Sequence, residues 1–154
     1  MPVVHRDAAM FLGACERLLT DGCAVRFRAE GTSMLPTVAD GELLLVEPVR
    51  GEDIRSGDIL LCRCPAGALA HRVADIITPP GGGREFLLRG DGKLGGDAPV
   101  AAADVLGRVM AASGNGRVRR LQGPIARLRW RLRAAVPVMR RTLLTRRGRT
   151  TAIP

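Results

Sequence analysis

Several residue types are scarce in this chain of 154 residues, and each scarcity argues against a class of protein. It has no tyrosine, three phenylalanines and one tryptophan, which leaves few rings for stacking on nucleic-acid bases. No run of about 18 apolar residues occurs, so we expect no ordinary transmembrane helix. The first seven residues carry both charges, unlike a secretory signal. We therefore expect a cytoplasmic protein, with peripheral contact to the inner membrane face left open.

Acidic residues are absent from the last third of the chain. All 15 lie at or before Asp104 with 11 basic residues, which gives residues 1–104 a net charge of −4. Residues 105–154 hold 13 basic residues and no acid, a net charge of +13. All basic residues except Lys93 are arginines. The charge thus divides into a slightly acidic part up to Asp104 and a strongly basic part after it. We expect one domain at residues 1–122 and a basic tail at residues 123–154.

The four cysteines are Cys15, Cys23, Cys62 and Cys64. The pair Cys62-Arg63-Cys64 has a one-residue gap, whereas zinc sites use spacings of two to four residues and a second pair. We expect four small buried or half-buried thiols, no metal and no cofactor.

The hydrophobic pattern predicts a mainly β protein. Apolar residues at three- and four-residue steps indicate a helix at about 7–20, which ends near Gly22. Alternating or short apolar runs bounded by turn residues indicate strands at 23–30, 42–46, 59–64, 70–77, 85–89, 105–112 and 117–121. The predicted fold is an antiparallel, partly closed β-structure with an N-terminal helix and a basic C-terminal amphipathic helix.

The C-terminal helix is predicted from one apolar stripe, with Pro137 expected to kink it. Two interpretations stay open. The helix could bind an anionic membrane surface or a partner, or it could pack on the β-body with its arginines in solvent. Nucleic acid is the weaker option because no helix-turn-helix is present. The stripe is Ile125, Leu128, Leu132, Ala135, Val136, Met139 and Leu143, and the candidate membrane or partner contacts are Arg127, Leu128, Trp130, Arg131 and Leu132.

Ser33 lies on a predicted tight turn between two strands. Gly31 permits unusual backbone angles before it, and Pro36 rigidifies the exit. Such a turn can expose a serine hydroxyl beside main-chain N–H groups, as a nucleophile with an oxyanion hole requires. A structural turn serine gives the same pattern.

Two further elements complete a candidate catalytic set. His71 is the one histidine outside the N-terminal segment, and a glycine-rich loop carries Asp91 and Asp97. Alone, each has an ordinary structural explanation. Together with Ser33 they supply a nucleophile, a base and an orienting acid in the order Ser, His, Asp.

Five segments in this order resemble the type I signal peptidase superfamily, which includes the LexA-like self-cleaving repressors. Most members use lysine where this chain has His71, and its one lysine falls later. The chain is therefore most similar to the Ser/His subtype of archaea, the endoplasmic reticulum and sporulation. The segments are Ser33-Met34-Leu35-Pro36-Thr37, Gly57-Asp58-Ile59, His71-Arg72-Val73, Gly90-Asp91 with Asp97, and Val105-Leu106-Gly107-Arg108-Val109.

The resemblance implies a serine endopeptidase that cleaves after small residues and processes leader or signal-like peptides. Ser33 would be the nucleophile, His71 the general base and Asp97 the residue that holds the imidazole. Asp91 would be a second acid, needed for activity or for the shape of the loop. The backbone N–H groups of Ser33 and Thr32 would form the oxyanion hole, and Met34 and Pro36 would contact the substrate. Residues 1–122 would be the catalytic domain.

Two departures from the family leave other functions open. Gly31 stands where members often have a hydroxyl residue, and no hydrophobic anchor segment occurs in the sequence. A non-catalytic member could keep the fold as a peptide- or membrane-binding module. A self-cleaving regulator would need a small-residue bond such as Ala66-Gly67, but this one lies in a predicted hairpin.

Overall fold

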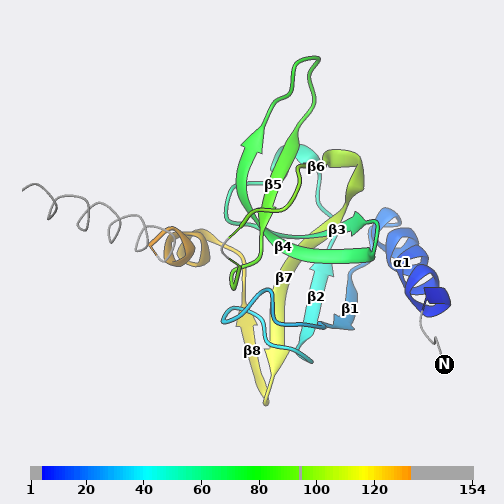
Figure 1. The fold of residues 1–154 in the computed structure, drawn as a ribbon. Coiled ribbons are helices and arrows are strands. Elements are labelled where there is room, and N and C mark those ends of the chain that lie inside the picture. Colours follow the sequence, from blue (N-terminus) through cyan, green and yellow to red (C-terminus); the bar gives the residue numbers. More distant parts are fainter. Residues whose placement is uncertain (1–4, 94, 133–154) are drawn as a thin grey trace, which may run out of the picture.

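The computed structural model describes residues 5–93 and 95–132, and one antiparallel sheet dominates it (Figure 1). A helix of residues 124–132 lies on the opposite side of the molecule from the N-terminal helix (Figure 1). The other elements are α1 (His5–Thr20), β1 (Val25–Arg28), β2 (Leu43–Glu47), η1 (Gly51–Asp53), β3 (Ile59–Cys64), β4 (Gly67–Ile77), β5 (Glu85–Arg89), β6 (Val100–Ala101), η2 (Ala102–Asp104), β7 (Val105–Gly114) and β8 (Arg117–Arg120).

The strand order is β1-β2-β7-β3-β4-β5-β6, with β8 paired to β7. The predicted antiparallel β-architecture with a helix at each end is thereby confirmed, and β3 and β5 have the predicted bounds. The prediction of a partly closed structure is wrong. Closure needs the two end strands to hydrogen-bond to each other, and β1 and β6 do not pair within the described residues. β6 has two residues and pairs with β5, so it provides no ladder that could reach β1.

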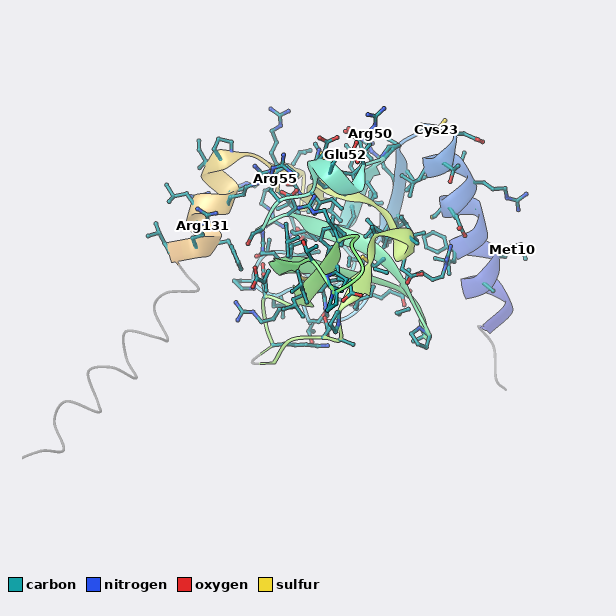
Figure 2. All side chains as sticks on the ribbon, turned by 90° about the horizontal axis from the view of Figure 1, so that it is seen from above. Met10, Cys23, Arg50, Glu52, Arg55 and Arg131 are labelled. Carbon is teal, nitrogen blue, oxygen red and sulfur yellow. The ribbon has the colours of Figure 1, made fainter. Side chains whose placement is uncertain are left out.

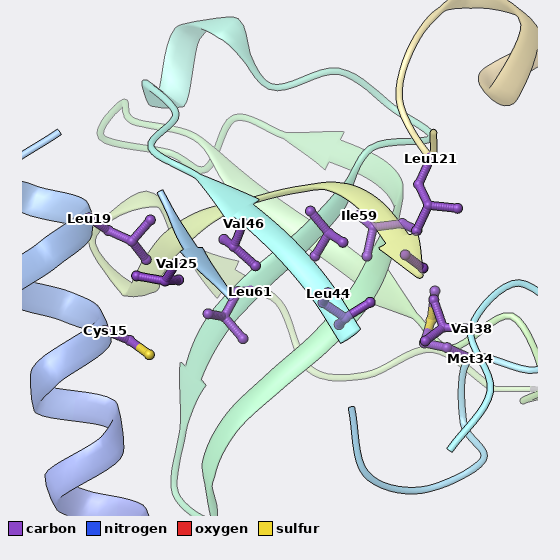
Figure 3. Close-up of a cluster of buried hydrophobic side chains, with 12 residues drawn as sticks. Cys15, Leu19, Val25, Met34, Val38, Leu44, Val46, Ile59, Leu61 and Leu121 are labelled. Carbon is purple, nitrogen blue, oxygen red and sulfur yellow. The ribbon is translucent and has the colours of Figure 1, made fainter. Parts of the chain in front are cut away.

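The core has two clusters because β3 is buried on both faces. Ile59 and Leu61 point into one cluster, and Leu60 and Cys62 point into the other. Figure 3 shows the first cluster, into which α1 directs Cys15 and Leu19. The second consists of Ile54, Leu60, Cys62, Val73, Phe86 and Leu88.

α1 is fixed at its C-terminal end and by one aromatic contact. Gly22 has a φ of +83°, and the Cys23 N–H donates to the Leu18 carbonyl at 2.8 Å. The rings of Phe11 and Phe27 meet edge to face, with centroids 5.3 Å apart. Cys23 is exposed, contrary to expectation, because it precedes β1 and has no sheet face beneath it.

The C-terminal helix is described only over residues 124–132. The predicted kink at Pro137 and the stripe residues Ala135, Val136, Met139 and Leu143 lie outside the described residues. Among the helices that the structure describes, none has the length and apolar character needed to cross a membrane.

Candidate active site

Ser33 lies in the turn between β1 and β2, and the core holds this turn in place. The Leu35 N–H donates to the Thr32 carbonyl at 3.1 Å, and the Val38 N–H donates to the Met34 carbonyl at 3.0 Å. Met34 and Val38 are both buried in the first core cluster. The turn is thus anchored by side chains that flank the serine, and Ser33 itself is half-buried.

Gly31 opens this turn with a φ of +92°, a conformation that strains residues with a Cβ. Its N–H donates to Asp40 Oδ1 at 2.7 Å. A hydroxyl-bearing residue would be strained here, which is a local reason for glycine at this position.

His71 joins the serine to an acid. Its side chain is fully buried in β4, and its Nε2 lies 2.9 Å from Ser33 Oγ. Its Nδ1 is hydrogen-bonded to Asp97 Oδ2. An ionised carboxylate can only accept, so Nδ1 carries the ring proton and Nε2 is left to accept the Ser33 hydroxyl proton. This tautomer allows His71 to act as a general base toward Ser33.

Asp97 is held in the loop that follows β5. Its backbone N–H donates to the Leu88 carbonyl at 2.9 Å, and its side chain is 24% exposed. Lys93, the one lysine of the chain, places Nζ 3.8 Å from Asp97 Oδ1. The lysine therefore lies beside the acid of the candidate triad.

Asp91, from the same loop, contacts Arg72 rather than His71. Arg72 Nε donates to Asp91 Oδ1 at 2.8 Å, Nη2 donates to Oδ2 at 2.6 Å, and Nη1 donates to the Gly57 carbonyl at 2.8 Å. The Thr37 hydroxyl also donates to Asp91. The side chains of neighbouring strand residues point to opposite faces. His71 therefore contacts Asp97, and Arg72 contacts Asp91. Asp91 thus ties the Ser33 turn to β4.

Glycine at position 90 lets the aspartate loop approach the serine. A Cβ there would lie 2.5 Å from the Ser33 carbonyl oxygen and 3.1 Å from His71 Nε2. The Gly92 N–H donates to the same carbonyl at 2.9 Å. The Gly90-Asp91-Gly92 segment therefore packs its backbone directly against the Ser33 turn.

Two main-chain donors next to Ser33 are not engaged. Across residues 5–93 and 95–132, the N–H groups of Thr32 and Ser33 donate to no acceptor. Unengaged N–H groups beside a serine hydroxyl are what an oxyanion hole requires. No metal-ligand cluster of three or more His, Cys, Asp or Glu side chains occurs in the described ranges.

The other predicted site residues are more dispersed. Met34 is buried in the core, so its side chain supports the turn, whereas Pro36 is exposed. Arg127 and Trp130 pack on the body, and Leu128, Arg131 and Leu132 are exposed.

Arg72 and Thr37 belong to the site, although the sequence reasoning gave them no role. The available signal was the position of Arg72 directly after His71 on a predicted strand. A buried arginine needs an acid nearby, and Asp91 was the candidate left without a partner.

No family model matches this chain, and a search of curated proteins finds no match either.

Proposed function

We propose that this protein is a serine endopeptidase with a signal-peptidase-like fold, in which Ser33, His71 and Asp97 form the catalytic site. The observation that carries the proposal is the 2.9 Å contact between His71 Nε2 and Ser33 Oγ, with Asp97 on the other ring nitrogen. A serine hydroxyl becomes a nucleophile when an oriented base accepts its proton, and this arrangement supplies that base.

The proposed reaction is acyl transfer. Ser33 Oγ attacks a peptide carbonyl carbon while its proton moves to His71 Nε2, and the imidazolium stays paired with Asp97. The oxyanion would be stabilised by the N–H groups of Ser33 and Thr32. His71 then protonates the leaving amine as the C–N bond breaks. Water, deprotonated by His71, hydrolyses the acyl-enzyme and regenerates Ser33.

A free strand edge next to His71 supports a peptide substrate. The N–H of Val73 donates to the Asp58 carbonyl, and its carbonyl accepts from the Gly57 N–H. Backbone groups of alternate strand residues point to the same side, so the N–H and C=O groups of His71 and Leu69 point toward β3. The N–H and C=O groups of Ala68 and Ala70 therefore point to the other side. On that side β5 ends at Arg89, opposite Arg72, so among the described residues β3 is the only strand paired with Ala68 and Ala70. An extended peptide could add to this edge and reach Ser33.

Peptide cleavage tests the proposal. Wild type incubated with a library of peptides that contain small residues should produce fragments, while Ser33→Ala and His71→Ala should be slower by at least about 100-fold. If wild type cleaves no peptide but binds the same peptides as His71→Ala does, the protein is a binding module instead. Thermal unfolding of the three proteins controls for folding.

A further inference from the structure

The helix of residues 124–132 docks on the body through Arg127 and Trp130. Arg127 Nε and Nη2 lie 2.9 Å and 2.8 Å from Oδ1 of Asp58, which is fully buried. A Cβ on Gly57 would lie 3.2 Å from Arg127 Cγ and 3.4 Å from Trp130 Cε3, so this helix packs closely on that glycine. The Trp130 ring centroid is 6.0 Å from Arg72 Cζ.

As a result, the apolar side of the helix faces away from the body. Ile125, Leu128 and Leu132 follow each other at three- and four-residue steps and are 73%, 57% and 61% exposed. Arg129 and Arg131 are exposed beside them. Figure 2 places Arg131 on the far side of the molecule from Met10 of α1. A helix that served only to complete the core would have buried this stripe.

The charge around the stripe indicates what covers it. Residues 105–154 contain 13 arginines and no acidic residue. An exposed apolar stripe flanked by one sign of charge suits the interface of an anionic bilayer, where leucines enter the acyl boundary and arginines meet lipid phosphates. A protein partner would need an apolar groove and an acidic rim in the same place.

We propose that the exposed face of helix 124–132, formed by Ile125, Leu128, Arg129, Arg131 and Leu132, binds an anionic membrane surface. This membrane contact does not rest on the proposed peptidase function.

Vesicle co-sedimentation of the full chain tests the contact, with phosphatidylcholine alone and with added phosphatidylglycerol. Wild type should bind the anionic vesicles and leave the neutral ones largely unbound. The double variant Leu128→Asp/Leu132→Asp should bind at least about tenfold more weakly. The matched control is Val118→Asp, because Val118 is a 74% exposed apolar residue on β8, and it should bind as wild type does.

A second pair of double variants compares the arginines that flank the stripe with exposed arginines on the β-body. Arg129→Gln/Arg131→Gln should weaken binding severalfold more than Arg117→Gln/Arg120→Gln, whose arginines are exposed on β8. The proposal is overturned if wild type does not bind anionic vesicles. It is also overturned if Leu128→Asp/Leu132→Asp binds the anionic vesicles as wild type does, because the binding would then come from the basic charge of the tail and not from the apolar stripe. Cleavage of a free peptide by the aspartate pair should be unchanged, so failure of the membrane contact and failure of the peptidase proposal are distinguishable.

Discussion

At the scale of single residues, the two loop aspartates have different partners and therefore different roles. Asp97 accepts from the ring of His71 and has a side chain that is 24% exposed, while the side chain of Asp91 is 9% exposed and pairs with the buried guanidinium of Arg72. Removing an acid that orients a base affects the reaction, whereas removing one partner of a buried ion pair leaves an uncompensated charge and affects the fold.

The pair Asp97→Asn and Asp91→Asn tests this division. Asp97→Asn should lower kcat by about 10²–10⁴-fold because His71 loses its orientation and tautomer, with little change in the free energy of unfolding. Asp91→Asn should lower the free energy of unfolding by about 3 kcal/mol because Arg72 is left without its carboxylate. Peptide kinetics and urea denaturation of both variants measure the two effects. If Asp97→Asn is the less stable variant and cleaves normally, the assignment is reversed.

At the scale of elements, β8 and the residue that precedes β2, Glu42, together support the Ser33 turn. Arg119 of β8 donates through Nη2 to Glu42 Oε1 at 2.7 Å and through Nη1 to the Thr37 carbonyl at 2.7 Å. The Ala39 N–H donates to Glu42 Oε2 at 2.9 Å. The Ala39 N–H, with help from the Arg119 guanidinium, holds the pKa of Glu42 below its ordinary value, against the opposing effect of burial. The ionised form of Glu42 therefore stabilises the folded state.

A pH dependence follows from this lowered pKa. The stabilisation is present above the unfolded-state pKa, near 4.5, and is lost as the pH falls through the lower folded-state pKa. Glu42→Gln should lower the free energy of unfolding by about 1–2 kcal/mol at pH 7, and the difference from wild type should shrink as the pH falls below 4.5. Denaturation at pH 7 and at pH 3 measures it. Glu52→Gln is the control, because its pair with Arg50 is 3.7 Å long and exposed, and it should change little. A Glu42 effect that is the same at both pH values would contradict the account.

At the scale of the whole molecule, the sequence predicts strands well where a hydrophobic run is bounded by turn residues, as in β3 and β5. It predicts the catalytic candidates because the chain has few groups of each kind: one lysine, one histidine outside the N-terminal segment, and one glycine-rich loop with two aspartates. Residue type and chain order are local information. They suffice for a list of groups but not for their pairing.

What the sequence does not predict depends on contacts between distant segments. β6 has two residues, too few to show an alternation of apolar and polar residues. Whether the end strands of the sheet pair with each other depends on the register between distant strands, which a local pattern does not contain. The need for glycine at position 90 arises only when the loop meets the Ser33 carbonyl, 57 residues earlier in the chain. The apolar stripe of the C-terminal helix was equally consistent with packing inward. Its outward orientation is fixed by contacts with distant residues: the pair of Arg127 with the buried Asp58 and the packing of Trp130 on Gly57.

The central claim, that Ser33 is a nucleophile activated by His71, is tested most directly by covalent labelling with a fluorophosphonate probe and intact-mass measurement. We expect one adduct on wild type, mapped to Ser33, no adduct on Ser33→Ala, and labelling of His71→Ala that is at least about 100-fold slower. Ser113→Ala, a control serine in β7, should be labelled as wild type is. Equal labelling of wild type and Ser33→Ala, or no labelling of folded wild type, would contradict the claim.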